Sequence, residues 1–401
     1  MKSFMLGRER VDAIELKCML VSRGVRVDKK VYKFFGKEYR VNINPLTCNC
    51  LILSDGTIVQ MTDVGFHLEY LSGILSWDNL KLLRYASELK TPFSLDLVGD
   101  EAVLFFEGEV VDIVSFPPVT DFFRQKTDDG LPFLGNVVIQ GVDWVAFPCL
   151  WPCEYASCGK PCQFCFSGAD HEKAAASRKA LPKPVSSRDV AQMVDVAVRD
   201  VGVNSVQLTG GSTFSGEMER EHILAYLRAI AERTPKTKLS GEILLYITPP
   251  KDPLVIDSYL AAGGDRIGAS LEVWDEALAA EITPGKIAYT TRERHLSLLE
   301  YTAEKFGPSV AFSNFIIGIE PFESLREGAT YLAERGILPT ASVWMPMGRP
   351  VRGSMKTPGI EEYRRVKELF AELYSKYGLV PPSSRGLNVC IERDIYQFSQ
   401  S

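Results

Sequence analysis

The sequence predicts an α/β protein, a partial six-unit barrel of parallel strands and helices that follows a smaller α+β domain. Beyond Gly135, apolar runs alternate with amphipathic segments in units of roughly 25 to 50 residues, a rhythm typical of parallel strands joined by right-handed helical crossovers. Before that point, short alternating strands and Asp-Gly or Glu-Gly turns dominate. A chain of 401 residues is long enough for two or three domains.

Residues 1–135 are expected to form the α+β domain. An Asp55-Gly56 turn and a Glu107-Gly108 turn each predict a β-hairpin. Pro117-Pro118 and the polar stretch 124–130 mark the end of the domain. Strands are predicted at Val31 to Phe35, 50–53, 58–61, 93–98, 102–106 and 110–116, and a helix is predicted near 79–89.

Residues 136–350 are expected to form the barrel, and residues 351–401 a C-terminal helix and tail that close it. Six units favour a partial, TIM-like (β/α)6 barrel over a closed eight-fold one, and the chemistry of such barrels lies at the C-terminal ends of the strands. Strands are predicted at 137–147, 203–208, 239–247, 266–271, 309–318 and 340–345, with helices at 190–201, 218–233, 252–262, 291–305, 322–335 and 360–377.

Charge and hydropathy limit the partners. Lys and Arg number 45 against 51 Asp and Glu, so the net charge of −6 argues against a general affinity for nucleic acid or for an anionic membrane. No apolar run reaches membrane-spanning length, and the first ten residues hold no signal-peptide stretch. We therefore expect a soluble, cytoplasmic protein, whose nine cysteines serve as metal ligands or redox groups rather than as disulfides.

Five of the nine cysteines fall within residues 149–165. Among them, only Cys158, Cys162 and Cys165 are separated by three and then two residues. Thiolates suit iron–sulfur clusters, and three ligands on a four-iron cluster leave one iron open for another ligand. The spacing therefore predicts a cluster that takes part in chemistry.

These three cysteines, with the aromatic Phe164 just before the last one, resemble the cluster motif of the radical S-adenosylmethionine (SAM) superfamily. The resemblance covers roughly residues 136–350. It implies that the open iron chelates the amino and carboxylate groups of SAM, and that one electron cleaves SAM to a 5'-deoxyadenosyl radical that abstracts hydrogen from a substrate. It also implies an electron donor of the flavodoxin or ferredoxin type.

The resemblance extends to the segments expected to bind SAM. Gly210-Gly211-Ser212 follows the second predicted strand and is similar to the family's Gly-Gly-Glu motif, with Ser212 in place of Glu. Glycines there allow the backbone to approach a ligand closely. Thr248 lies at the end of the next predicted strand and is a further candidate for cofactor binding.

The segments 270–275, 282–286 and 292–294 resemble the biotin synthase, hydrogenase-maturase, methylornithine synthase and lipoyl synthase branch. This implies that Glu272 contacts SAM and that Arg294 pairs with its carboxylate, with Arg292 as the alternative. Gly318 would leave room for the adenine base.

The sequence allows two other metal sites. Zinc could be held by the three cysteines together with His171 or Cys153, although the paired spacing typical of zinc sites is absent. A second iron–sulfur cluster could be held by Cys48, Cys50, Cys149 and Cys153, and Cys390 is a further thiol in the chain. The alternative is that these thiols are ordinary packed residues.

The substrate is not specified by any motif. Met345 to Pro350 resembles the closing segment of the biotin and lipoyl synthases, and Arg349 and Arg352 could bind a carboxylate or phosphate. We expect radical SAM chemistry on a small molecule, by rearrangement or sulfur insertion; modification of a peptide or protein recognised by the N-terminal domain and a non-enzymatic metal scaffold are the alternatives. Candidates for holding substrate, each of which could also be a wall or core residue, are Tyr246, Thr248, Asn314, Trp344, Met347 and Arg349.

Overall fold

The centre of the molecule is a curved seven-stranded sheet with the strand order β15-β14-β13-β12-β11-β10-β9. The computed structural model describes residues 2–35, 49–61, 90–117, 121–134, 136–150, 153–165, 185–344, 357–383 and 390–400. Six strands run parallel, and β9 at the edge pairs antiparallel with β10. The strands are β9 (Val138–Gln140), β10 (Trp144–Leu150), β11 (Ser205–Gly210), β12 (Ile243–Tyr246), β13 (Arg266–Gly268), β14 (Ala311–Ile317) and β15 (Leu338–Val343).

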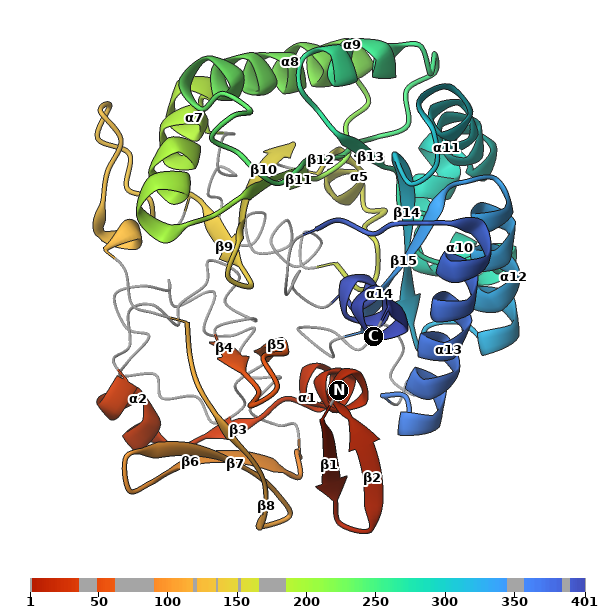
Figure 1. Ribbon diagram of the computed structural model, residues 1–401. Coiled ribbons are helices and arrows are strands. Elements are labelled where there is room, and N and C mark those ends of the chain that lie inside the picture. Colours follow the sequence, from red (N-terminus) through yellow and green to blue (C-terminus); the bar gives the residue numbers. More distant parts are fainter. Residues whose placement is uncertain are drawn as a thin grey trace.

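Helices cover the outer face of this sheet, so that the arrangement is the predicted partial barrel (Figure 1). The start of α7 shows how the sequence fixes such a helix, because the Ser186 side chain accepts a hydrogen bond from the Asp189 amide as an N-cap. The helices are α5 (Glu154–Ser157), α7 (Ser187–Val196), α8 (Gly216–Arg233), α9 (Val255–Ala261), α10 (Glu276–Ile282), α11 (Arg292–Phe306), α12 (Phe322–Glu334), α13 (Ile360–Tyr377) and α14 (Glu392–Gln400).

The strands place apolar and polar side chains on opposite faces. In β11, Val206 and Leu208 are fully buried in the hydrophobic core, whereas Gln207 and Thr209 line an internal cavity. Successive side chains of a strand point to opposite faces of the sheet, so this alternation separates the core from the barrel interior. The polar inner face is therefore encoded directly by the strand sequence.

The N-terminal part forms its own small sheets around α1 (Ala13–Arg23). Both hairpins predicted from the Asp-Gly and Glu-Gly turns are confirmed, as β4–β5 and β7–β8. A four-stranded sheet has the order β3-β6-β7-β8. The other elements are β1 (Ser3–Leu6), β2 (Glu9–Asp12), β3 (Arg26–Val27), α2 (Lys29–Phe35), β4 (Asn49–Ile52), β5 (Ile58–Met61), β6 (Phe93–Val98), β7 (Glu101–Phe106) and β8 (Glu109–Val114).

Ion pairs join α1 to the C-terminal helices. Lys17 Nζ lies 2.6 Å from the Asp394 carboxylate of α14, and Lys367 of α13 lies 2.7 Å from Glu15. Burial works to raise the pKa of Glu15, but hydrogen bonds from Lys367 and from the Asp12 backbone lower it overall. The two ends of the chain thus close on each other across a charged contact, and both termini lie in this region (Figure 1).

Two predicted strands are wrong. Residues 31–35 belong to helix α2, because the Asp28 carboxylate accepts from the Lys30 amide and the Asp28 carbonyl accepts from the Val31 amide. The strand predicted over 137–147 is broken into β9 and β10 by a turn at Gly141, whose φ of 57° favours glycine. The helix predicted near 79–89 lies outside the described residues.

The remaining predicted strands and helices of the barrel are confirmed, with ends that move by up to about four residues, as is usual for boundaries drawn from sequence. None of the helices that the structure describes combines the length and apolar character needed to cross a membrane.

Candidate functional site

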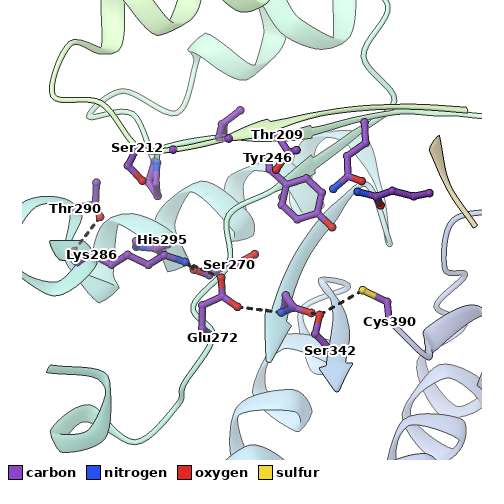
Figure 2. A pocket seen from close by; sticks show the side chains of 18 residues that line it. Thr209, Ser212, Tyr246, Ser270, Glu272, Lys286, Thr290, His295, Ser342 and Cys390 are labelled. Carbon is purple, nitrogen blue, oxygen red and sulfur yellow. Dashed lines mark hydrogen bonds and ion pairs between the residues drawn. The ribbon is translucent and has the colours of Figure 1, made fainter. Parts of the chain in front are cut away.

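A cavity of about 270 Å³ opens at the C-terminal ends of the parallel strands, where the barrel was expected to carry its chemistry (Figure 2). Its wall is mostly polar. Of the residues predicted for the site, six line it: Gly210, Gly211, Ser212, Tyr246, Glu272 and Asn314. The other lining residues are Gln140, Gln207, Thr209, Ile247, Pro249, Gly268, Ser270, Lys286, Thr290, His295, Ser342 and Cys390.

A buried ion pair crosses one side of the cavity. Lys286 Nζ lies 2.9 Å from the Glu272 carboxylate and donates to the Ser270 carbonyl at 2.6 Å. Burial works to lower the pKa of Lys286, but the Glu272 carboxylate raises it overall, so the lysine is a cation. Lys286 belongs to a π-helical turn, Lys286–Thr290, a form that often marks functional sites.

The backbone holds Glu272 in an unusual conformation. Its φ is 69°, a region that residues other than glycine seldom occupy. The Glu272 amide donates to the Asn314 carbonyl at 2.8 Å, and the Ile316 amide donates to the Glu272 carbonyl at 3.1 Å. The end of the β13 segment is thus fixed to β14, which directs the carboxylate to the cavity.

Hydrogen bonds continue from Glu272 across the barrel interior. Asn314 Nδ2 donates to Glu272 at 2.9 Å, and Ser342 Oγ donates to Asn314 Oδ1 at 2.9 Å. Ser342 Oγ also lies 3.4 Å from Cys390 Sγ, and Figure 2 shows this chain of side chains. The segment that follows β13, the strands β14 and β15, and the C-terminal tail are therefore connected through polar groups that face one cavity.

The cysteine loop is attached to the loop that follows β11. Glu154, at the start of α5, accepts hydrogen bonds from Thr213 Oγ1 at 2.8 Å and from the Phe214 amide. On its other side the Gln163 amide donates to the Ile282 carbonyl at 2.8 Å. The loop is therefore held against two segments that line or flank the cavity.

The thiols of the motif are accessible to differing degrees. Cys158 is exposed, and Cys162 and Cys165 are partly exposed. Burial raises the pKa of Cys162 to about 12, opposed by the positive charge of Lys286. Cys162 is close enough to Lys286 for the lysine charge to lower the pKa of the thiol. The cysteine loop therefore lies beside the ion pair of the cavity.

Close approach of two loops explains one of the paired glycines. A Cβ on Gly211 would overlap the Cys153 Cα, so only glycine fits there. The Ser212 amide donates to Cys153 Sγ at 3.4 Å. Cys153 is therefore engaged with the Gly-Gly-Ser loop.

The predicted metal alternatives are placed as follows. Within the described ranges, no three His, Cys, Asp or Glu side chains gather closely enough to hold a single metal ion. His171 and Cys48 lie outside those ranges, as does the side chain of Cys149. Cys50 lies in β4 of the N-terminal part, where burial raises its pKa to about 12. A four-iron cluster differs from a single ion in taking each thiolate on a separate iron, and three cysteines on one short loop beside a cavity fit that donor set.

Neither candidate arginine lines the cavity. Arg294 donates through Nη1 to the Tyr289 carbonyl at 3.0 Å and through Nη2 to the Pro249 carbonyl, while its buried Nε has no partner in the described part of the chain. Arg292 stacks on the Trp274 ring with its Cζ 3.7 Å from the centroid and faces an outer groove. The cation that reaches the cavity is Lys286.

Thr248 and Gly318 make contacts within the protein. The Thr248 amide donates to the buried Glu219 carboxylate at 2.8 Å, and Thr248 Oγ1 accepts from the Thr213 amide at 3.3 Å. Gly318 has a φ of 93°, and a Cβ there would overlap the Pro358 ring. Both residues position the loops around the cavity without lining it.

Phe164 and Trp344 share a small apolar cluster with Val273, Ala279, Ile282, Ile316 and Ile319, so the cysteine loop rests on the outer ends of β14 and β15. The candidates Met347, Arg349 and Arg352 lie outside the described residues.

Nine polar or ionisable residues of the cavity wall were not among the candidates from the sequence: Gln140, Gln207, Thr209, Ser270, Lys286, Thr290, His295, Ser342 and Cys390. For Gln207 a pattern was present, because a glutamine stands between Val206 and Leu208 in a buried strand. For His295 none was. Its Nδ1 lies 2.7 Å from the Thr291 carbonyl, and burial, with the charge of Lys286, lowers its pKa to about 3, so the imidazole is neutral.

Comparison with known proteins adds one relative by sequence. No known family model matches the chain. A bacteriochlorophyllide c C-7(1)-hydroxylase of Chlorobaculum limnaeum is 25% identical over 341 residues, which cover 81% of this chain and 83% of the hydroxylase.

Two solved structures align with part of the chain. A radical SAM methyltransferase from Sphaerobacter thermophilus aligns with a TM-score of 0.42 at 15% identity, over 78% of this chain and 82% of that one. The radical SAM coproporphyrinogen III oxidase HemN from Escherichia coli aligns with a TM-score of 0.35 at 15% identity, over 55% of this chain and 51% of that one.

The cysteine spacing and the place of the cysteine loop at the strand ends of a partial barrel resemble the radical SAM superfamily, and the chain is similar in sequence to an enzyme, the hydroxylase. The superfamily and the branch within it stay predictions.

Proposed function

We propose that this enzyme uses SAM and a four-iron cluster to abstract hydrogen from a small-molecule substrate of the tetrapyrrole class. The observation that carries the proposal is the single Cys158–Cys162–Cys165 loop, attached to a polar cavity at the strand ends. Bound together, cluster and SAM supply a 5'-deoxyadenosyl radical, which is chemistry of the cofactor rather than of the protein.

The protein contributes binding and orientation. Cys158, Cys162 and Cys165 would hold three irons of the cluster, and the backbone of Gly210 and Gly211 would contact SAM at the cavity wall. The Glu272 carboxylate would accept from the SAM ammonium group, because it is the acidic side chain that lines the cavity.

Lys286 is the better placed cation for the SAM carboxylate. It lines the cavity, whereas both terminal nitrogens of Arg294 already donate to backbone carbonyls. Arg294 would then act indirectly, by bracing the Tyr289 and Pro249 segments around the bound cofactor. This assigns to Lys286 the role that the resemblance had implied for Arg294.

The substrate class rests on the sequence relative, which acts on bacteriochlorophyllide c. The relationship extends over four-fifths of each chain. A small-molecule substrate also agrees with the neutral polar side chains of the cavity, such as Gln140, Gln207 and Ser342. The electron donor of the flavodoxin or ferredoxin type remains part of the proposal.

The test is anaerobic reconstitution with iron and sulfide, followed by dithionite and SAM, with and without bacteriochlorophyllide c. We expect 5'-deoxyadenosine to form, to increase when the pigment is present, and to carry deuterium from pigment labelled at C-7(1). Absence of 5'-deoxyadenosine from a fully loaded protein would contradict the enzyme chemistry. Formation that is indifferent to the pigment, with no change in pigment mass, would reject the substrate class alone.

A further inference from the structure

One wall of the cavity consists of neutral polar side chains, which we call the inner wall: Gln140, Gln207, Tyr246, Ser342 and Cys390. Figure 2 shows Tyr246, Ser342 and Cys390 on the side of the cavity opposite Ser212, Thr290 and Lys286. The inner wall thus lies opposite Lys286, and Asn314 connects its Ser342 to Glu272.

Two side-chain carbonyl oxygens of the inner wall have no hydrogen-bond partner among the residues described. They are Oε1 of Gln140 and Oε1 of Gln207, and both atoms are shielded from solvent. Gln207 as a whole is only 8% exposed. A buried acceptor without a donor destabilises a fold, so each such group in a native protein calls for an explanation.

Gln192 provides an internal comparison, because it too is only 8% exposed. Its Oε1 accepts from the Asp128 amide at 2.9 Å, and its Nε2 donates to the Asp128 carboxylate at 3.0 Å. The two glutamines are equally buried but differ in their hydrogen bonds. Oε1 of Gln192, away from the cavity, has a donor, and Oε1 of Gln207, which lines the cavity, has none among the described residues. The difference indicates that the partner of Gln207 comes from the cavity.

The strands place the two amides together. Gln140 pairs with Trp144 of β10, and Gln207 pairs with Ala146 of the same strand from the other side. Tyr246, from β12, lines the same cavity with its ring (Figure 2) and contacts Phe312 edge-on at 4.9 Å between ring centroids. The wall therefore combines two free amide carbonyls with an aromatic surface.

This combination selects the chemistry of the ligand. Amide carbonyls accept hydrogen bonds and need a donor, whereas a carboxylate brings only acceptors. The cation of the cavity, Lys286, is paired with Glu272 at 2.9 Å and lies on the side proposed to bind SAM. The two unpartnered oxygens need a donor, which a planar, uncharged group with N–H bonds supplies and a carboxylate does not.

We propose that the inner wall is a substrate subsite that binds a neutral, planar N–H donor, such as a pyrrole, lactam or carboxamide, and rejects carboxylates. The inference rests on the proposed function in treating the barrel interior as the place where substrate binds. It names the part of the substrate that lies deepest in the barrel.

The test uses a matched pair of probes, pyrrole-2-carboxamide and pyrrole-2-carboxylate, titrated by saturation-transfer NMR against the reconstituted protein loaded with SAM. We expect the carboxamide to bind at least ten-fold more tightly than the carboxylate. Gln207→Leu and Gln140→Leu should each weaken carboxamide binding five-fold or more. Gln192→Leu, a matched change at an equally buried glutamine, should leave the affinity unchanged.

Thermal unfolding of the same variants separates a binding role from a structural one. Gln207→Leu should keep or raise the midpoint, because it removes an unpaired acceptor, whereas Gln192→Leu should lower it by breaking two hydrogen bonds. Equal binding of the two probes, an unchanged affinity in Gln207→Leu, or a midpoint for Gln207→Leu as low as that for Gln192→Leu would each overturn the subsite.

The two proposals fail differently. A protein that forms 5'-deoxyadenosine but does not distinguish the probes contradicts the subsite alone. A protein that binds the carboxamide through Gln207 yet forms no 5'-deoxyadenosine contradicts the proposed function.

Discussion

Two buried lysines of this molecule show how the same local chemistry serves different ends. Lys17, with a fully buried side chain, pairs with Asp394 at 2.6 Å where α1 meets α14. Lys286, 15% exposed, pairs with Glu272 at 2.9 Å. In both cases burial works to lower the pKa of the lysine, and the partner carboxylate raises it overall.

The surroundings of the two pairs distinguish them. The Lys17 pair is enclosed between the N-terminal part and the C-terminal helix, whereas the Lys286 pair faces the cavity and continues through Asn314 and Ser342. A buried ion pair is by itself weak evidence for either stability or function. The cavity beside the Lys286 pair, with the hydrogen bonds that continue from Glu272, supports the role proposed for Lys286.

The largest effect is expected from the cysteine loop. Replacing Cys158, Cys162 and Cys165 together by Ala removes three thiolate ligands and should abolish both the visible absorbance of the cluster and SAM cleavage. The measurements are iron and sulfide content, the absorbance spectrum and 5'-deoxyadenosine formation. Cys18→Ala, at a buried thiol of α1, is the control and should retain the cluster. Undiminished SAM cleavage in the triple variant would contradict the assignment.

Lys17→Met should unfold more easily than the native protein by about 3 kcal/mol, because it leaves the Asp394 carboxylate without its buried partner. Chemical denaturation measures this change, and SAM affinity in the folded variant should match the native value. A destabilisation under about 0.5 kcal/mol would show that the pair does not join the two ends of the chain.

Stability should depend on pH through Glu219. Burial raises its pKa from 4.5 to about 7, against the hydrogen bonds from Thr248. The folded protein therefore holds this proton to a higher pH than the unfolded chain, so the stabilising contribution is full below pH 4.5 and is lost as the pH rises through 7, by up to about 3 kcal/mol.

Glu219→Gln keeps an acceptor for the Thr248 amide and cannot titrate. Its unfolding free energy should fall less steeply between pH 4.5 and 7 than that of the native protein, although Glu392, with a pKa also raised by burial to about 7, still contributes. Identical pH profiles for the two proteins would rule out a raised pKa at Glu219.

Lys286→Met sharpens the comparison of the two lysines. SAM affinity should weaken by about 1.5–3 kcal/mol, because a charge-assisted contact is lost. Stability should fall less than in Lys17→Met, because Asn314 still donates to Glu272. Equilibrium dialysis with labelled SAM measures the affinity, and a value equal to the native one would return the carboxylate contact to Arg294.

Arg292→Ala should have the smallest effect. It removes the stacking of the guanidinium over Trp274, worth about 0.5–1 kcal/mol of stability, and leaves SAM affinity unchanged because Arg292 faces the outer groove. A large loss of SAM affinity in this variant, with none in Arg294→Ala, would support the alternative that the sequence left open.

The fold was predictable where local pattern and global structure agree. Alternation in segments such as Ser205 to Thr209, followed by amphipathic helices, sufficed for the barrel. It failed at Val31 to Phe35, where an apolar run typical of a strand is started as a helix by Asp28. The hydrogen bonds that Asp28 accepts from the Lys30 and Val31 amides outweighed the strand propensity of these residues.

The candidate site was predictable only in part. Residues that follow a strand end, such as Gly210 and Glu272, can be located from the strand pattern. Cys390 cannot, because it reaches Ser342 from a separation of 48 residues along the chain. The orientation of Arg294 toward two backbone carbonyls likewise depends on loop geometry that no local pattern specifies.

The central claim is that Cys158, Cys162 and Cys165 carry a four-iron cluster whose open iron binds SAM. Electron paramagnetic resonance of the reconstituted, reduced protein tests it most directly, before and after addition of SAM. The account predicts the spectrum of a reduced four-iron cluster that shifts when SAM is added, in the native protein and in Arg292→Ala. A spectrum that SAM leaves unchanged, in a protein with four irons per chain, would contradict it.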